Sequence, residues 1–125
     1  MHPTVGKVVE EIPHGLLESP FVPVVLSTVG VFDARYLRAS PAFLSLVGCS
    51  WEEIASVPLV GQGAALSNPA RDRRLMLLDL EGGYLAERAT LRHASGRLIE
   101  TVITAQRLWI DGTALDLEIF QPLPR

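Results

Sequence analysis

Few residues in this chain have side chains that could carry out chemistry, and they lie far apart. The one cysteine is Cys49, and the three histidines are His2, His14 and His93. A nucleophilic site needs its nucleophile beside a base, and a zinc site needs several ligands at short spacings. The sequence has neither pattern, nor a phosphate-binding loop. We therefore expect surface histidines, a packing role for Cys49, and no metal site.

The charged residues also form no evident acid–base couple. Glu10-Glu11 and Glu52-Glu53 are adjacent pairs, and adjacent residues on a helix point apart. The one dense charge run, Arg71-Asp72-Arg73-Arg74, fits an anion- or partner-binding patch and also a solvated first turn of a helix. The second interpretation is the more ordinary one, although basic residues there oppose the helix dipole. The sequence thus predicts a protein that is not an enzyme.

Composition indicates one globular domain. The chain has 125 residues, 48% hydrophobic and 20% charged, which is enough to build a core. A net charge of −3, with acids and bases interspersed, argues against direct nucleic-acid binding. Pro23 and Gly30 interrupt the longest apolar-rich stretch, Phe21–Phe32, so no membrane span is expected. The N-terminus has no basic region followed by an apolar run, so no secretory signal is expected. A single cysteine fits a reducing compartment, which predicts a cytoplasmic protein.

Residues 1–20 are expected to form a helical extension. Val5, Val8, Val9 and Ile12 recur at helical spacing, which predicts a short amphipathic helix that ends at Pro13. The apolar stripe of this helix must be covered, either by the sheet of its own chain or by a second copy of the chain.

Residues 21–123 are expected to form the domain itself. The predicted elements are strands over Val22–Thr28 and Tyr36–Ala39, short helices at Phe43–Val47 and Trp51–Ala55, a longer helix over Asn68–Glu81, and strands over Tyr84–Ala94, Arg97–Ile110 and Thr113–Gln121. The tight turns Ser95-Gly96 and Asp111-Gly112 join the last three strands into antiparallel hairpins.

The two short helices have their own start and stop signals. Ser40 is a suitable N-cap, and Pro41 suits the first helical position. Gly48 can end that helix in a left-handed conformation. Ser50 and Glu53 then have the spacing of a capping box for the next helix.

The stretch from Phe32 to Glu53 resembles the opening of a PAS domain. Ser40-Pro41-Ala42-Phe43 stands where that family has Asn-Pro-Ala-Phe, and Gly48-Cys49-Ser50 stands where it has Gly-Tyr-Ser, followed by two acids. With the order of the later elements, the resemblance covers residues 21–123. It implies an α+β fold, a five-stranded antiparallel sheet with short helices on one face. It also implies a sensory or regulatory role in signal transduction.

Alternation along the last strands separates two faces of the sheet. Ile99, Thr101, Ile103 and Ala105 are expected on the inner face, as are Leu115, Leu117, Ile119 and Gln121. The outer face then has more apolar residues than a solvated face needs, namely Val102, Leu108, Ile110 and Phe120.

The resemblance implies a ligand cavity between the inner face and the helices. The candidate pocket-lining residues are Phe43, Val47, Leu59, Leu78, Leu91, Thr101, Ile103, Ala105, Ile119 and Gln121. Because small proteins pack densely, a filled or nearly filled interior is favoured over a bound cofactor.

No cofactor is expected from the resemblance. In the flavin-binding, light-sensing branch of the family, Leu59 would stand at the photoreactive cysteine, and Leu91 and Thr101 at two flavin-contacting asparagines. Only Gln121 coincides with that branch's glutamine. The haem-binding branch places its ligand histidine on the long helix, and Asn68–Glu81 has none.

The resemblance also implies partners. PAS domains commonly pair through the outer sheet face, so a homodimer is expected, with candidate interface residues Val5, Val8, Val9, Ile12, Val102, Leu108 and Phe120. A small-molecule ligand is a second expected partner. The third is an effector in cis or in trans, such as the kinase of a two-component system, a cyclase or a transcription regulator. The chain fits a free-standing domain and a piece of a longer regulator equally well.

Two other functions stay open. A small enzyme of the ketosteroid-isomerase type also has a curved antiparallel sheet, but it needs an isolated carboxylate or a His–Asp pair facing its cavity. The predicted inner faces offer only Thr101, Gln121 and Glu87, which argues against it. The other alternative is a dimerisation module without a ligand.

Overall fold

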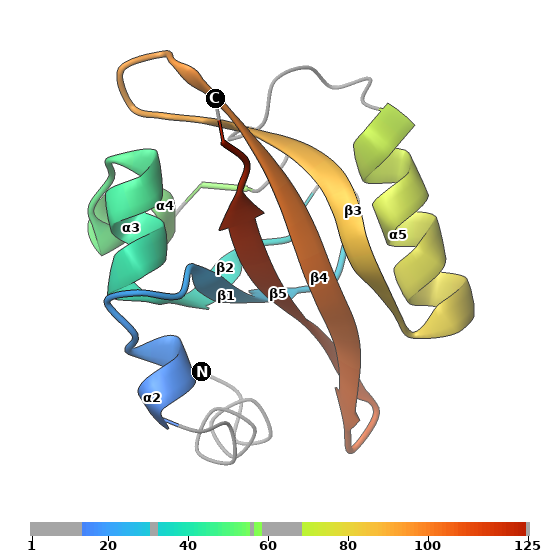
Figure 1. The fold of residues 1–125 in the computed structure, drawn as a ribbon. Helices are drawn as coiled ribbons and strands as arrows, with labels where there is room; N and C mark the ends of the chain where they lie inside the picture. Colours follow the sequence, from blue (N-terminus) through green and yellow to red (C-terminus); the bar gives the residue numbers. More distant parts are fainter. Residues whose placement is uncertain (1–13, 31–32, 56, 59–68, 125) are drawn as a thin grey trace.

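The computed structural model describes residues 14–30, 33–55, 57–58 and 69–124. Five strands form one antiparallel sheet in the order β2-β1-β5-β4-β3 (Figure 1). The elements, in chain order, are α2 (His14–Leu17), β1 (Val24–Thr28), β2 (Tyr36–Ala39), α3 (Pro41–Val47), α4 (Trp51–Ala55), α5 (Pro69–Glu81), β3 (Gly83–Arg92), β4 (Leu98–Ile110) and β5 (Thr113–Pro122). The predicted α+β architecture is thus confirmed.

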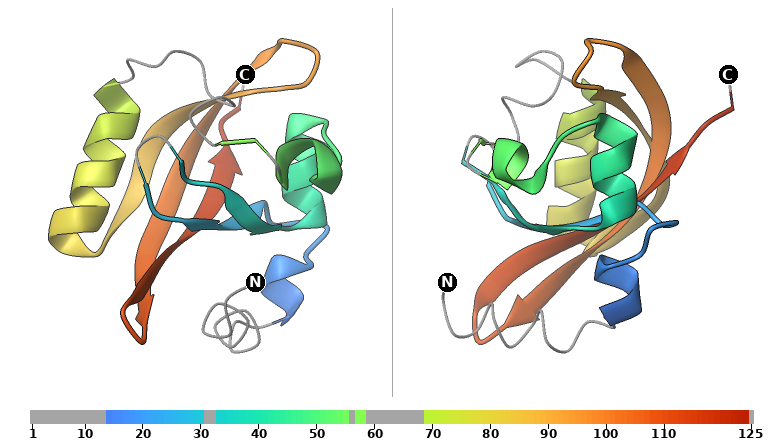
Figure 2. Two further views of the ribbon diagram at one scale, coloured as in Figure 1. Left: turned by 180° about the vertical axis from the view of Figure 1, so that it is seen from behind. Right: turned by 90° about the vertical axis from the view of Figure 1, so that its left-hand side faces the viewer.

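The helices lie on both sides of the sheet. Figure 2 shows α3, α4 and α5 on its concave side. The short helix α2 packs on the other side, where Leu17 contacts Val24, Leu26 and Leu115. The predicted stripe Val5, Val8, Val9 and Ile12 lies outside the described residues. No helix among the described residues is long and apolar enough to cross a membrane.

Ser40 joins the start of α3 to the first strand. Its side-chain oxygen accepts hydrogen bonds from the backbone N–H of Phe43, at 3.2 Å, and of Val24, at 3.0 Å. Its hydroxyl donates to the carbonyl of Val22 at 2.8 Å, and the residue is fully buried. The predicted N-cap therefore also fixes the chain that enters β1.

The other predicted helix signals are present as well. Gly48 ends α3 with a φ of 68°, and its N–H donates to the carbonyl of Leu44. Ser50 and Glu53 form the capping box of α4, because each side chain accepts from the other residue's backbone N–H, at 3.0 and 3.3 Å. Gly82, with a φ of 79°, follows the last turn of α5.

The Asp111-Gly112 turn sets the register of β4 against β5. Both residues have positive φ, 48° and 80°, as a two-residue hairpin turn of this kind requires. Ile110 therefore pairs with Thr113, and the same register places Ile103 opposite Phe120. Side chains at paired positions lie on the same face of a sheet, so Phe120 shares the face of Ile103.

This register corrects the prediction for β5. Phe120 is 4% exposed and lies in the inner core, where its ring centroid is 5.0 Å from that of Phe43. The expectation that Phe120 lies on the outer face is wrong. The outer face instead has Leu115, Leu117, Ile119 and Gln121, three of which belong to or pack on the cluster around Leu17. Apolar residues occur on both faces of β5 because α2 covers the outer one.

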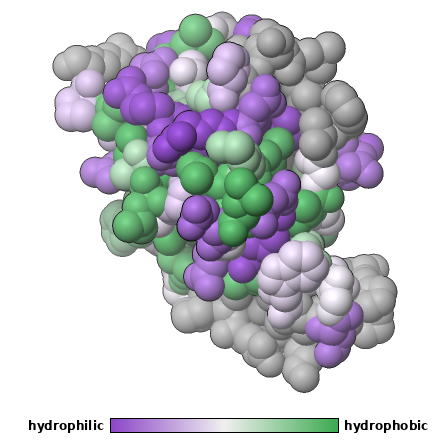
Figure 3. All heavy atoms as spheres, turned by 90° about the vertical axis from the view of Figure 1, so that its right-hand side faces the viewer, coloured by the Kyte–Doolittle hydropathy of each residue, from purple (hydrophilic) through white to green (hydrophobic). Residues whose placement is uncertain are grey.

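The inner core otherwise follows the prediction. The β4 residues Thr101, Ile103 and Ala105 are buried on the concave side. The core cluster consists of Val25, Phe43, Val47, Ile54, Leu78, Tyr84, Ala89, Ile103, Ala105 and Phe120. On the side of the molecule formed by α5, apolar side chains gather among hydrophilic ones (Figure 3), and the large exposed apolar residues of α5 are Met76 and Leu80.

The corrected register can be tested with neighbouring substitutions in β5. Phe120→Ala should lower the free energy of unfolding by roughly 3–5 kcal/mol, because it leaves a cavity in the core. Gln121→Ala should change it by less than about 0.5 kcal/mol, because that side chain is exposed on the outer face. Urea unfolding followed by circular dichroism measures both. Equal losses for the two variants would contradict the register.

Candidate functional site

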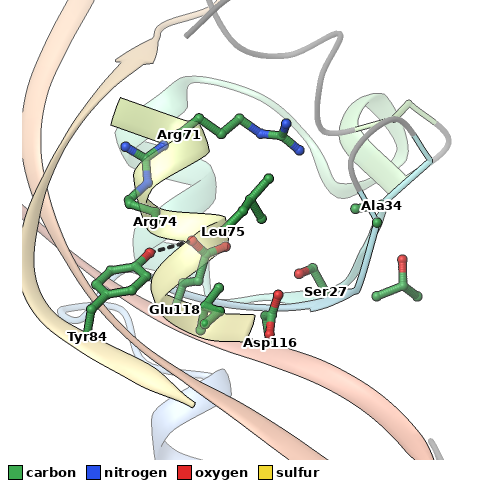
Figure 4. A pocket seen from close by; sticks show the side chains of 11 residues that line it. Ser27, Ala34, Arg71, Arg74, Leu75, Tyr84, Asp116 and Glu118 are labelled. Carbon is green, nitrogen blue, oxygen red and sulfur yellow. Dashed lines mark hydrogen bonds between the residues drawn. The ribbon is translucent and has the colours of Figure 1, made fainter. Parts of the chain in front are cut away.

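A small cavity with charged walls lies between α5 and the sheet, and we call it the chamber (Figure 4). Its volume is about 50 Å³, which holds a few water molecules. Its polar walls come from α5, β1, β3 and β5, through Arg71, Arg74, Ser27, Thr28, Tyr84, Asp116 and Glu118.

Simple periodicity brings these side chains together. Arg71, Arg74 and Leu78 recur at intervals of three and four residues, so they share one face of α5. Asp116 and Glu118 are two residues apart in β5 and point to the same face of the sheet as Phe120. The chamber is therefore the polar end of the inner face.

The Glu118 carboxyl is the most perturbed acid in the chamber. The Tyr84 hydroxyl donates to Glu118 Oε2 at 3.5 Å. The pKa of Glu118 is raised from 4.5 to about 7, chiefly by burial; the charge of Arg74 opposes this rise and the charge of Asp116 adds to it. Burial and the charge of Glu118 also raise the pKa of Tyr84 well above its ordinary value. Glu118 thus changes charge near neutral pH.

The neighbouring Asp116 is neutralised by a buried ion pair. Its two carboxylate oxygens accept from Arg107 Nε at 2.9 Å and Arg107 Nη2 at 3.1 Å. Arg107 also donates to Asp79 on α5, and its hydrogen bonding to Asp116 is the main reason why the pKa of Arg107 is raised. The two-pronged geometry makes the pair strong and specific in orientation. Glu118, in contrast, forms no ion pair with a described residue.

A second cavity, which we call the apolar cavity, lies between α3, α4 and the end of β3. The described residues around it line a half-open hollow of about 340 Å³. Its walls are mainly apolar, with a few polar groups, and comprise Tyr36, Phe43, Val47, Cys49, Glu53, Ile54, Leu91, Arg92, His93 and Ala94. Burial, followed by the charge of Glu53, raises the pKa of the Cys49 thiol, which disfavours the nucleophilic thiolate.

The hairpin between β3 and β4 is joined to the end of α3 beside this cavity. The N–H of Ala94 donates to the carbonyl of Val47 at 2.8 Å. The His93 ring packs so closely on Gly48 that a Cβ there would lie 2.4 Å from His93 Nε2. Glycine at this position therefore serves both the left-handed end of the helix and the contact with the ring.

The predicted pocket residues are divided among several places. Phe43, Val47 and Leu91 line the apolar cavity, and Leu78 lines the chamber. Thr101, Ile103 and Ala105 are buried in the inner face, where the Thr101 hydroxyl donates to the carbonyl of Ala89. Ile119 and Gln121 lie on the opposite face, so their assignment to the pocket is wrong. Leu59 lies outside the described residues.

The chamber does not follow from alternation alone. With Leu115, Leu117 and Ile119 expected on the inner face of β5, Asp116 and Glu118 fall on the outer one. The Asp111-Gly112 turn, which is visible in the sequence, indicates the correct register of β4 against β5. It places Arg107 directly opposite Asp116, and an Arg–Asp pair facing each other across two strands is expected to interact. Among the described residues, no group of three or more His, Cys, Asp or Glu could hold a metal ion.

Comparison with known proteins identifies the fold. No protein-family model and no curated protein matches the chain. Solved structures do match it. The Rhodobacter sphaeroides LOV protein has a TM-score of 0.78 and 18% identity over 95% of this chain and 69% of its own. A PAS domain from a two-component sensor histidine kinase has a TM-score of 0.70 and 13% identity over 94% and 99%. The LOV domain of a blue-light activated histidine kinase from Erythrobacter litoralis has a TM-score of 0.67 and 12% identity over 83% and 97%. The chain therefore has the fold of a PAS domain.

The described residues at these positions do not fit the flavin of the light-sensing branch of the PAS family. Gln121, the one residue that coincides with that branch in sequence, lies exposed on the outer face. The Thr101 hydroxyl is engaged by the carbonyl of Ala89 at 2.8 Å, and Leu91 has no polar group. The three described positions thus offer a flavin no polar contact inside the domain.

The charge on Glu118 should make stability depend on pH. The carboxyl is protonated in both states below pH 4.5, and between pH 4.5 and about 7 only the unfolded state loses the proton, so stability falls as pH rises. Glu118→Gln should abolish this fall. With allowance for solvent screening, the variant should be more stable than the parent by about 2–3 kcal/mol at pH 8.

Urea unfolding at a series of pH values measures this difference. Glu100→Gln, a substitution of an exposed glutamate on β4 whose pKa is lowered by Thr90 and Arg88, is the matched control and should keep the slope between pH 5 and 7. Parallel curves for the parent and Glu118→Gln would show that Glu118 titrates normally.

Proposed function

We propose that this domain is a sensory or regulatory module of a signal-transduction protein that binds a small molecule in the apolar cavity. The observation that carries the proposal is the cavity itself. Its volume of about 340 Å³ lies within the usual range of ligand sites, and its walls combine apolar side chains with a few polar groups. The fold supports the same role, since two structures similar to this chain come from histidine kinases.

The walls favour a small, uncharged and planar ligand. The ring of Tyr36 meets that of Phe43 edge to face, with centroids 5.5 Å apart, and both line the cavity. Ile54 and Leu91 add aliphatic surface. The Glu53 carboxylate and the Arg92 guanidinium both line the cavity, so its wall has charges of both signs and does not favour an ion of one sign.

A ligand here would act on the helix-to-sheet connection. The cavity is bounded by α3, by α4 and by the β3–β4 hairpin, and the hairpin is tied to α3 by Ala94 and His93. We propose that a shift at this joint reaches an effector, in cis or in trans, such as a kinase, a cyclase or a transcription regulator.

A small isomerase-like enzyme is the second candidate, and one observation favours it. The corrected register supplies what the sequence analysis found missing, a carboxylate with a raised pKa on the inner face, beside the Tyr84 hydroxyl. The chamber, however, has a volume of about 50 Å³, which admits water and no substrate of that class. The sensory function therefore has the better support.

Ligand binding can be tested with indole as an uncharged planar probe. Leu91→Trp should fill the apolar cavity and weaken binding at least tenfold, because the probe loses its space. Leu85→Trp is the matched control, since it makes the same change on the same strand at a side chain that is 81% exposed. Ligand-observed NMR titrations measure the affinities. Equal affinity in both variants, or no binding to the parent, would refute the proposed site.

We also propose that the domain forms a homodimer through the outer sheet face. That face presents a shallow groove lined by Leu85, Thr104, Leu117 and Ile119, and Leu108 lies on the same face. Val102 belongs to this face too, because it pairs with Gln121. Phe120 is no longer a candidate for the interface, because it lies in the inner core. The stripe of Val5, Val8, Val9 and Ile12 remains a proposed cover for this surface.

The dimer can be tested by sedimentation of the intact chain and of a version lacking residues 1–12. The deletion stops before α2 because Leu17 belongs to the core. We expect a dimer at high micromolar concentration that the deletion weakens. A monomer in both would refute the dimer, and an unchanged dimer would remove the N-terminal stripe from it.

A pair of matched variants then locates the interface. Leu85→Glu should weaken the dimer because its side chain borders the outer groove. Leu80→Glu, at a side chain on α5 that is 76% exposed, should leave it unchanged. The reverse result would place the interface on the apolar patch of α5.

A further inference from the structure

The charge run Arg71-Asp72-Arg73-Arg74 at the start of α5 is divided between two environments. Asp72 and Arg73 are exposed, and Arg73 forms an ion pair with Glu87 at 2.7 Å. Arg71 and Arg74 are half-buried and line the chamber. Like charges three residues apart on one helix face destabilise each other. A negative charge between these two arginines would therefore be favourable.

The two acids of the chamber do not balance both arginines. Asp116 is bound through both of its carboxylate oxygens by Arg107. Glu118 lines the chamber, but it forms no ion pair with a described residue, and it accepts its hydrogen bond from the Tyr84 hydroxyl at 3.5 Å. Glu118 supplies at most one negative charge opposite two positive ones. The polar walls therefore have a net positive charge.

The groups around Arg74 suit an oxyanion. The Arg74 Nη1 donates to the carbonyl of Arg88 at 2.7 Å, which fixes the position of the guanidinium. Figure 4 shows this group beside the Tyr84 hydroxyl and the Glu118 carboxyl. A guanidinium has five N–H donors in one plane, and pairs of them match the two oxygens of a carboxylate. The contact with Arg88 uses one donor, so the others can serve an anion.

The volume of the chamber limits the ion to a small one. The chamber of about 50 Å³ has room for roughly four water molecules, at about 10–15 Å³ for each. A planar anion with about three or four heavy atoms fills the same space. Ser27 and Thr28 of β1 line the same chamber and add hydroxyl groups to its polar wall.

We propose that the chamber binds a small, planar, monovalent oxyanion of the size of formate, which Arg71 and Arg74 hold and to which protonated Glu118 donates a hydrogen bond. An ionised Glu118 would repel the anion, so the two negative charges exclude each other. The site is separate from the proposed ligand site in the apolar cavity, because the two places share no lining residue.

Among the described groups that face the chamber, Glu118 is the one whose pKa is raised to about 7. Tyr84 of β3 and Tyr36 of β2 stay protonated there, because burial and the charge of Glu118 raise the pKa of both. Asp116 of β5 is paired with Arg107 of β4, the arginines of α5 stay charged, and the lining groups of β1 are uncharged. The affinity for the anion should therefore fall about tenfold between pH 6 and pH 8, as Glu118 loses its proton.

Sodium formate is the probe, titrated into the full-length ¹⁵N-labelled chain at pH 6. Each formate solution is matched by one of sodium butyrate at the same concentration, which keeps the ionic strength and the carboxylate and changes the size. Formate should cause saturable amide shifts around the chamber, with a Kd no tighter than about millimolar for so small a ligand. No saturable shift, or the same shifts with butyrate, would overturn the proposal and leave a chamber that holds only water.

Matched variants on α5 locate the site. Arg74→Gln should weaken formate binding at least tenfold, because it removes a guanidinium that lines the chamber. Arg73→Gln makes the same change of charge one residue away, at a side chain that points to Glu87, and should change the affinity less than twofold. Equal losses in the two variants would indicate a general attraction to a basic helix and would overturn the site.

The pH dependence tests the role of Glu118 and stays decisive if Arg74→Gln fails to fold. Glu118→Gln has a neutral donor at every pH, so its affinity for formate should be the same at pH 6 and pH 8. Glu100→Gln, at an exposed glutamate of β4, should keep the tenfold fall of the parent. A fall that survives Glu118→Gln, or a parent whose affinity does not change with pH, would overturn the proposal.

Discussion

The interior of this domain depends on the two-residue turn at Asp111-Gly112. A turn of this length leaves no freedom in the pairing of the strands that it joins, because a shift by one residue would reverse every side chain between the two faces. The inner face of β5 therefore consists of Asp116, Glu118 and Phe120, opposite Arg107, Ala105 and Ile103. The aromatic contact to Phe43, the buried ion pair and the chamber all follow from that pairing.

The elements themselves could be predicted because local chemistry determines their ends. Ser40, Gly48 and the pair Ser50 and Glu53 act within a few residues of their own positions, so their roles can be inferred from the sequence alone. The face of β4 could be predicted for a similar reason, since polar residues such as Glu100 and Gln106 mark its exposed side.

The face of β5 could not be inferred from alternation, because it is apolar on both sides. Leu115 and Ile119 are covered by the region around Leu17, which is distant in sequence, and nothing in their own segment shows that cover. The rule that apolar residues face the core then gives the wrong side. The same rule places Glu118 on the outer side, so it does not predict the candidate site. Only the long-range pairing of Arg107 with Asp116 corrects both errors.

The two acids on the inner face of β5, Asp116 and Glu118, have very different surroundings. Removing one partner of a buried ion pair costs about 3–5 kcal/mol, so the pair of Arg107 and Asp116 holds β4, β5 and, through Asp79, α5 in one arrangement. The role of this ion pair is therefore structural. Glu118 is partly buried and lacks such an ion pair with a described residue, and its pKa is raised, chiefly by burial. An apolar residue at position 118 would stabilise the fold more, because burying a polar group costs free energy. Sites where a chain departs from a local rule without an evident structural gain are the places where function is expected. Glu118, which accepts the hydrogen bond of the Tyr84 hydroxyl in the chamber, is therefore the residue of this interior that packing alone does not explain.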